Sequence, residues 1–425
     1  MRRQVAAYAI FAGIVLSCLS AWPGSPVPIW TAGLCLWGGA LLLAANVASR
    51  NLRQSLVLMA VGLAGIGYGA LHGQPLTLET FLSANVSLVG MVAAVSFLAL
   101  IAPTSTLVRQ PGQGRSIFTT LLGVHLFGSV INMSAAFIFG DRMAAGGKLN
   151  LGQSLILSRA SSLGAFWSPF YAAMAVGLSV APHANVFQVM LTGIPLAILG
   201  MGLSFWQLQH NAESMDIQGV PVSFAALALP MSMAAAVLLL HHCYPPLPIL
   251  TLITLLAPLM AVMVGLHRSA GQVRVVVQRV SGHIEDRLPR MVNEILLFLS
   301  AGLLTQGGKA VIAGLGDWRL FDSFAGVQAV IMYLAIVASS LLGLHPIIGI
   351  SMFAAMLNGL DVDPSLLALV SICSWAVGTA VGPLSGINLA LYGRYGIDTY
   401  QITRHTLLYA LAMSVLVSVM LLLVS

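Results

Sequence analysis

Long apolar runs separated by short polar joints follow one another along almost the whole chain. A transmembrane helix needs about 20 predominantly apolar residues, and about 11–13 hydrophobic segments of this kind can be counted. The segments span residues 5–22, 28–48, 54–72, 84–103, 116–139, 154–181, 185–208, 220–241, 247–266, 291–315, 322–358, 364–392 and 398–424. This pattern predicts an all-α polytopic membrane protein.

One long hydrophilic stretch, 267–290, interrupts the series and carries five arginines against one glutamate and one aspartate. Positively charged loops remain on the cytoplasmic side of a membrane, so we predict a cytoplasmic basic loop there. The predicted organisation is N-terminal transmembrane helices over 1–83, a first repeat half with extra helices over 84–266, the basic loop over 267–290, and a second repeat half over 291–425.

The basic residues also set the orientation of the chain. Arg2 and Arg3 precede the first apolar run, which places the N-terminus in the cytoplasm of a bacterial inner membrane. We interpret that run as an uncleaved first helix rather than a secretory signal, because it continues directly into the next span.

Two places in the chain do not fit simple crossings. Segments 116–139 and 154–181 must together supply one net crossing, so one of them is a re-entrant hairpin or a broken helix, which is tolerated only where it lines a protein-walled cavity. Arg142 and Lys148 favour 116–139 as the hairpin. Segment 322–358 is too long for one span and carries Gly343 and Pro346 midway, which predicts a second hairpin.

These two places share a sequence pattern. The sequence LLGVH at 121–125 recurs as LLGLH at 341–345, and each copy precedes an apolar segment rich in polar residues, 158–169 and 371–388. The predicted topology runs the two copies in opposite directions across the membrane. Two inverted repeats with re-entrant hairpins or broken helices are typical of alternating-access carriers, which bind substrate at the repeat interface.

Composition excludes several function classes. The chain has 425 residues, 58% of them hydrophobic and 7% charged, far from the roughly 25% charged residues of a soluble domain. The net charge of +6 lies in the joints between spans, where it sets topology, so we expect no nucleic-acid partner. The four cysteines lack metal-ligand spacing, and no nucleotide, hydrolase or zinc motif is present. We therefore expect no metal, no cofactor and no enzyme activity.

Polar residues inside apolar runs normally face a cavity or a partner, and they are the candidate site. The predicted substrate-binding residues are Arg159, Ser161, Ser162, Ser168, Asn132, Ser134, Ser351, Thr379, Ser385 and Asn388. Arg159 can clamp a carboxylate through two parallel hydrogen bonds. The alternative is an interfacial arginine that reaches the lipid headgroups from near a helix end.

Three further residues are candidates for proton or ion coupling. His125 and His345 are candidate proton carriers, because the histidine side chain ordinarily titrates near neutral pH, although each can equally be a hydrogen-bonding partner between packed helices. Lys309 follows the polar stretch 305–308 in the span that opens the second half. We predict that these three residues carry the coupling.

The interruptions at 128–134, 161–169, 346–351 and 379–388 resemble those of the ion transporter superfamily of bacterial permeases over about residues 84–425. That superfamily includes gluconate and citrate permeases and the large membrane subunits of TRAP transporters. The resemblance implies two inverted repeats that bind an anion, often together with sodium or protons.

We therefore predict a secondary active transporter that moves a small organic anion, a carboxylate, across the inner membrane, coupled to H⁺ or Na⁺. The expected partners are the anionic substrate, the coupling ion, the lipid bilayer and a second copy of the chain in a homodimer. An alternative is a membrane subunit of an envelope or resistance assembly without transport activity of its own, with the basic stretch as its docking surface.

Overall fold

The computed structural model describes residues 1–425 except 76, 102–112, 145–147, 211–227 and 317. Within the described residues the protein is built of helices, and the little β-structure there includes an isolated bridge between Phe324 and Val362. Eight helical stretches are long and apolar enough to cross a membrane by length and composition, and five shorter apolar helices accompany them. The prediction of an all-α polytopic membrane protein is confirmed.

The chain forms two compact units that interleave in sequence. Unit 1 comprises Met1–Ala102, Ser232–Leu320 and Ser351–Gly359, and unit 2 comprises Pro103–Met231, Phe321–Ile350 and Leu360–Ser425. The helices of unit 1 are α1 (Arg2–Ser20), α2 (Ile29–Leu42), η1 (Ala44–Asn46), α3 (Ser49–Leu71), α4 (Leu78–Ser83), α5 (Val86–Val95), η2 (Ser96–Leu100), most of α12 (Ala228–Cys243), α13 (Ile249–Arg268), α14 (Val273–Asp286), η5 (Leu288–Met291) and α15 (Val292–Gly314).

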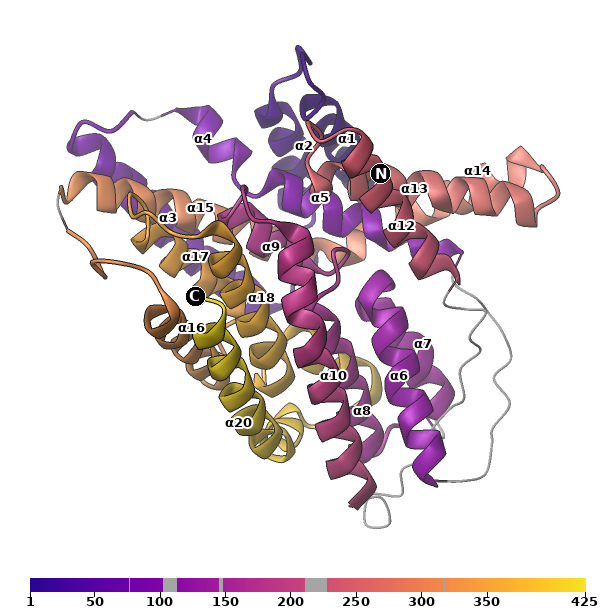
Figure 1. Cartoon of the computed structure of the whole chain (residues 1–425). Helices are drawn as coiled ribbons and strands as arrows, with labels where there is room; N and C mark the ends of the chain where they lie inside the picture. The colour runs from indigo at the N-terminus through magenta and orange to yellow at the C-terminus, as the bar shows by residue number, and fades with distance from the viewer. Residues whose placement is uncertain (76, 102–112, 145–147, 211–227, 317) are drawn as a thin grey trace. The chain divides into compact units, whose positions relative to one another are not determined.

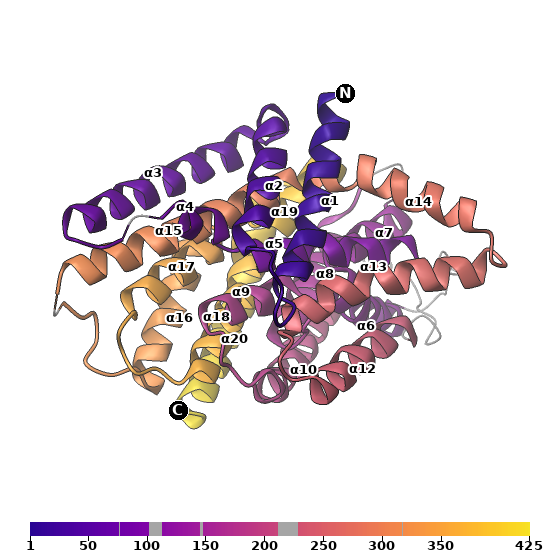
Figure 2. The same ribbon diagram turned by 90° about the horizontal axis from the view of Figure 1, so that it is seen from above.

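The most extensive contact in unit 1 joins α3 and α15, which lie side by side in Figure 2. Small residues allow the two backbones to meet. A Cβ atom built on Gly65 would lie 2.6 Å from the carbonyl oxygen of Gly307, and one on Gly62 would lie 2.7 Å from that of Leu303. Glycines at helix contacts of membrane proteins permit this close approach, because packing rather than hydrophobic burial holds such helices together.

Unit 2 contains two series of helices with the same order: a pair of helices, an interrupted helix and a long helix. The first series is α6 (Gln113–Ile131), α7 (Met133–Met143), α8 (Leu151–Leu163), η3 (Gly164–Phe166), α9 (Ala172–Val180) and α10 (Val186–His210). The second is α16 (Gly326–Leu341), α17 (Pro346–Met356, whose last residues belong to unit 1), α18 (Pro364–Val381), α19 (Gly386–Tyr395) and α20 (Thr399–Leu423).

The contacts within unit 2 follow the same repetition. In the first series α6 packs against α8 and α10, and in the second α16 packs against α18 and α20. Across the series α8 contacts α20, and α10 contacts α18. Figure 1 shows α8 and α10 beside α6 and α7, with α16, α18 and α20 grouped together. The interrupted helices therefore lie where the two series meet.

The stretch 267–290, which we predicted as a loop, is largely the helix α14. Its apolar residues Val273, Val276, Val277, Val280 and Ile284 recur at three- and four-residue steps, which is the period of an amphipathic helix. Val276 and Ile284 are buried while the arginines on the other side are exposed. The high arginine content concealed this periodicity, because a basic stretch between apolar runs is typical of a cytoplasmic loop.

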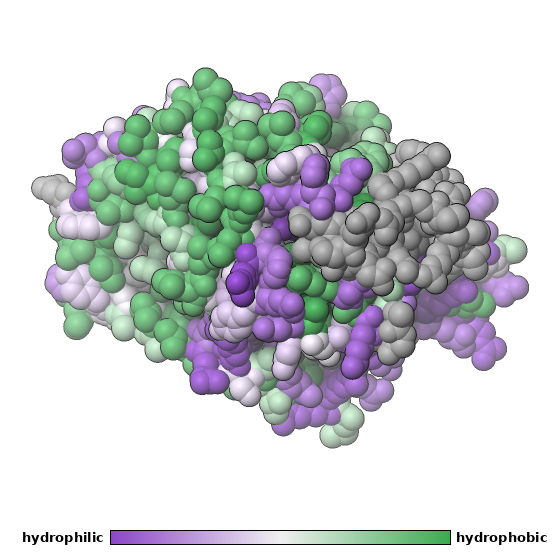
Figure 3. All heavy atoms as spheres, turned by 90° about the horizontal axis from the view of Figure 1, so that it is seen from below, coloured by the Kyte–Doolittle hydropathy of each residue, from purple (hydrophilic) through white to green (hydrophobic). Residues whose placement is uncertain are grey.

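Apolar side chains gather over a large part of the surface shown in Figure 3. The exposed apolar side chains of α16 and α20 include Val327, Ile331, Leu408, Leu411 and Val415, each of which exposes between 48% and 66% of its surface. A soluble protein does not leave rows of large apolar side chains in water, whereas a lipid-facing helix presents them to the acyl chains.

Candidate functional site

The first helix interruption lies between α8 and α9, and hydrogen bonds connect it to α6 and to the turn between α6 and α7. Asn132 occupies that turn with a φ of 50°, a conformation that asparagine tolerates better than most residues. Its side-chain amide donates a 3.0 Å hydrogen bond to the carbonyl oxygen of Phe170. The Ser168 hydroxyl, also in the interruption, donates to the carbonyl oxygen of Ser129 on α6. Polar side chains thus satisfy backbone groups that the interruptions release.

The second interruption, between α18 and α19, depends on Asn388. Its amide donates to the carbonyl oxygen of Gly382 at 2.9 Å and more weakly to that of Ala380 at 3.4 Å, which satisfies the open end of α18. The hydroxyl of Ser385 caps the start of α19 by accepting from the backbone N–H of Asn388. The side-chain oxygen Oδ1 of Asn388 accepts a 2.7 Å hydrogen bond from the hydroxyl of Ser158 on α8. One buried asparagine therefore joins both interrupted helices.

The hydroxyl residues of α8 divide between two faces of that helix. Ser158 and Ser162 are four residues apart and face the second series, where the hydroxyl of Thr379 lies 3.3 Å from that of Ser162. Ser161 points toward α6, packs close to Gly128, and has a buried hydroxyl without a hydrogen-bond partner. Of the predicted serines, Ser161 and Ser162 therefore both lie on α8 but on different faces of it.

Arg159 lies on a third face of α8 and is 2% exposed. Its guanidinium donates to the side-chain oxygen of Gln207 on α10 at 3.0 Å and to the carbonyl oxygen of His405 on α20 at 2.7 Å. The group also lies 4.9 Å from the centre of the Tyr409 ring, close enough for a cation–π interaction. Its Nε atom is buried without a partner, and no carboxylate among the described residues forms an ion pair with it.

A buried guanidinium without a counter-ion is costly, because its charge has left water without an opposite charge to replace the solvation. Arg159 is therefore a positive charge buried inside unit 2, and its Nε–H donor has no hydrogen-bond partner. The interfacial alternative, in which the side chain reaches the lipid headgroups, does not match this burial.

The two predicted histidines each lie against a tryptophan. His125 Nε2 accepts a 3.2 Å hydrogen bond from the indole N–H of Trp167, which assigns its own proton to Nδ1. The ring centroids of His345 and Trp375 lie 4.8 Å apart, edge to face. His345 Nδ1 accepts from the backbone N–H of Ile347 and so caps the first turn of α17. These contacts give both rings defined packing roles at the interruptions.

The remaining predicted residues are placed differently. Lys309, on α15, and Ser351, on α17, belong to unit 1, whereas the others belong to unit 2. Ser134 lies in α7, and its side chain falls outside the described residues. Among the described residues, no three histidine, cysteine, aspartate or glutamate side chains gather in a way that could hold a metal ion.

Several residues around the predicted site could not be recognised from the sequence. Gln207 and Tyr409, which contact Arg159, lie in other helices, and no local pattern marks them. A second polar cluster joins α7 to α19, where Arg394 donates two hydrogen bonds to the carboxylate of Asp141 at 2.6 and 2.8 Å. The Tyr395 hydroxyl donates to the same carboxylate at 2.8 Å. The only available signal was the isolated acid at the end of the predicted hairpin.

One glycine fixes the distance between α10 and the first interruption. A Cβ atom built on Gly193 would overlap the carbonyl oxygen of Phe166, the last residue of η3. Glycine is required here because backbone meets backbone. The contact holds the unwound segment against the helix that carries Gln207.

No family model matches the chain, and no curated protein matches it. Among solved structures, it is similar to the YdaH transporter of Alcanivorax borkumensis, whose crystal structure was described as having an unusual topology, with 14% sequence identity and a TM-score of 0.44 over 87% of this chain and 84% of the other. The identification of the chain as a polytopic membrane protein therefore rests on its own apolar helices among the described residues.

Proposed function

We propose that this protein is a secondary active transporter of a small organic anion, with the carboxylate of the substrate bound by Arg159. The observation that carries the proposal is the burial of a guanidinium that has no acidic partner among the described residues and retains an unused donor. An anionic substrate supplies the missing counter-charge. A substrate can also dissociate from Arg159 after transport, whereas an aspartate or glutamate side chain of the protein would remain paired with it.

The surroundings of Arg159 support a transported ligand rather than a structural one. The residue lies on α8, whose opposite face is bonded to the second series through Ser158 and Asn388. At the ends of interrupted helices, side chains form hydrogen bonds with free backbone groups. Those hydrogen bonds can be exchanged for hydrogen bonds to a substrate. Binding of a carboxylate at Arg159 requires that the bond to Gln207 or to the His405 carbonyl oxygen be exchanged for one to the substrate.

The coupling ion is part of the proposal. Either H⁺ or Na⁺ drives transport across a bacterial inner membrane, with the N-terminus in the cytoplasm. His125, His345 and Lys309 are the proposed proton carriers, and the unwound carbonyl groups near Ser385 and Asn388 are the proposed ligands of Na⁺. Parallel uptake assays under a pH gradient and under a sodium gradient distinguish the two.

The test is uptake of radiolabelled carboxylates into liposomes containing the purified protein. We compare the wild type with Arg159→Gln, Arg159→Lys and the control Arg404→Gln, which removes an exposed arginine from α20. Truncating one partner of a buried, hydrogen-bonded charge interaction removes about 2–5 kcal/mol, so Arg159→Gln should reduce uptake by about 30-fold or more. Arg159→Lys should retain part of the activity, because the positive charge remains while bidentate hydrogen bonding to the carboxylate is lost.

Elution of each variant as a single symmetric species in size-exclusion chromatography establishes that the protein is folded. Wild-type uptake rates in a folded Arg159→Gln variant would show that Arg159 does not bind the substrate. Absence of uptake of every carboxylate by the wild type under both gradients would refute the transport proposal itself.

A further inference from the structure

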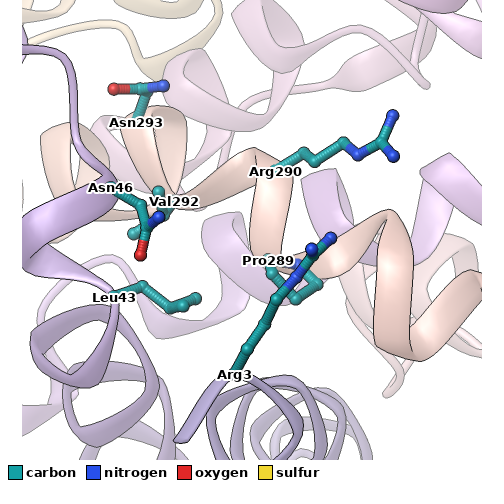
Figure 4. A pocket seen from close by; sticks show the side chains of 7 residues that line it. All are labelled: Arg3, Leu43, Asn46, Pro289, Arg290, Val292 and Asn293. Carbon is teal, nitrogen blue, oxygen red and sulfur yellow. The ribbon is translucent and has the colours of Figure 1, made fainter.

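A pocket of about 360 Å³ lies in unit 1, apart from the residues proposed to bind substrate. Its lining comes from the start of α1, the η1 turn after α2, η5 and the start of α15. The lining residues are Arg3, Leu43, Asn46, Pro289, Arg290, Val292 and Asn293. Figure 4 shows the two guanidinium groups on one side of the pocket and the two amide side chains on the other.

The polar lining of this pocket offers donors without a fixed acidic partner inside it. Arg3 makes a 3.5 Å ion pair with Asp286, but both side chains are more than half exposed, and an exposed pair of this kind holds an arginine weakly. Within the described residues no hydrogen bond or ion pair joins the Arg290 guanidinium to another group. The side-chain oxygen of Asn293 accepts from the backbone N–H of Ala48, which leaves its NH₂ group as a donor.

The position of the pocket along the helices indicates its depth in a membrane. Helices α1 and α2 follow each other after a short link and pack together, so the start of α1 and the end of α2 lie at the same end of a helical hairpin. α1 is long and apolar enough to span a bilayer, and Arg3 stands in its first turn. Arginines at the end of a span lie at the level of the lipid headgroups.

The apolar lining residues Leu43 and Val292 are each 2% exposed, so they form the closed floor of the pocket and a ligand meets mainly its polar side chains. Two guanidinium groups with amide donors fit a phosphate group. At the end of a membrane span such a group belongs to a phospholipid whose acyl chains extend into the bilayer, whereas free phosphate enters from the aqueous phase. Basic pockets between transmembrane helices commonly hold anionic lipid headgroups.

We propose that this pocket binds the phosphate group of an anionic phospholipid, held by Arg3 and Arg290. The bound lipid neutralises the two arginines and links the first turn of α1 to the start of α15. The site is independent of the substrate proposed for Arg159, so either proposal can fail without the other.

The test is native mass spectrometry of the delipidated full-length protein titrated with phosphatidylglycerol, phosphatidylcholine or inorganic phosphate. The variant is the double substitution Arg3→Gln/Arg290→Gln. The matched control is Arg274→Gln/Arg279→Gln, which removes two exposed arginines from α14 and leaves the pocket intact. Each arginine near an anionic lipid surface strengthens binding about fivefold, so the pocket variant should bind phosphatidylglycerol about 25-fold more weakly than wild type.

The expected result is a phosphatidylglycerol adduct that is stronger than the phosphatidylcholine adduct, weakened in the pocket variant and unchanged in the control. Equal weakening in both variants would overturn the proposal, because it would show general attraction to the basic surface. Equal binding of phosphatidylcholine would overturn the requirement for an anionic lipid. Binding of inorganic phosphate that blocks the lipid adduct and is lost in the pocket variant would identify a soluble anion as the ligand and overturn the lipid assignment.

Discussion

The contact between α3 and α15 makes a quantitative prediction about stability. Gly65→Ala adds a Cβ atom that would lie 2.6 Å from the carbonyl oxygen of Gly307, 2.7 Å from its carbonyl carbon and 3.0 Å from its Cα. None of these atoms can rotate away, because all belong to the backbone of α15. The two helices must therefore separate by about 0.5–1 Å, a gap that forfeits about a quarter to a half of the attraction between facing atoms.

The magnitude follows from two opposing effects. Overpacking of a well-packed contact destabilises by about 1–3 kcal/mol, while replacing glycine by alanine within a helix stabilises by about 0.5–1 kcal/mol. The net loss for Gly65→Ala is between about 0 and 2.5 kcal/mol, so the comparison with a glycine that meets no neighbour is what isolates the overpacking. A change of 1 kcal/mol moves the melting temperature by about 2–4 °C in domains of about 150–250 residues.

The control is Gly67→Ala on the same helix, because a Cβ atom there meets no atom within 4 Å. It experiences only the helix-propensity gain, so its melting temperature should stay level or rise slightly. Both variants are measured by the thermal unfolding of purified protein in one detergent. Equal melting temperatures for the two variants would refute the reasoning, since they would show that α3 and α15 do not meet at Gly65.

Two further predictions concern unit 2. Gly193→Ala forces α10 away from the carbonyl oxygen of Phe166, so it should abolish carboxylate uptake and lower the melting temperature. The control Gly202→Ala places its Cβ where no atom lies within 4 Å and should leave both unchanged. Normal uptake by the Gly193→Ala variant would contradict the role of this contact. Asp141→Asn breaks the ion pair with Arg394 and should lower stability by about 0.2–1 kcal/mol, the value of a half-exposed pair. The loss should shrink at high ionic strength, and a loss independent of salt would point to packing instead.

The order of helices and the places where they break could be predicted from the sequence. Apolar runs long enough to span a membrane are recognisable without tertiary information, and glycine, proline, serine and asparagine mark the interruptions because they tolerate or satisfy released backbone groups. The interruptions observed at Asn132, 167–171 and 382–385 lie within or beside the predicted stretches.

The partners of the polar residues could not be predicted. Arg159 was identified because an arginine in an apolar run is rare, but its contacts lie 48 and 246 residues away and depend on how helices pack. The distribution of Ser158, Ser161 and Ser162 over two faces likewise depends on which helices surround α8. The helix α14 was missed for a different reason, since charge and periodicity gave conflicting indications in the same residues.

Asn132 and Ser168 donate to backbone carbonyl oxygens and so connect the end of α6 and the turn after it to the unwound segment after α8. Because of these bonds within one series, the turn and the interrupted helix should move together as one rigid body. The contact between the two series includes hydrogen bonds between two side chains, such as the bond from Ser158 to Asn388, beside the bond from Arg159 to the backbone of His405. Hydrogen bonds between two side chains can break and re-form without unwinding a helix. If unit 2 changes conformation, we therefore expect the two series to move relative to each other at this contact.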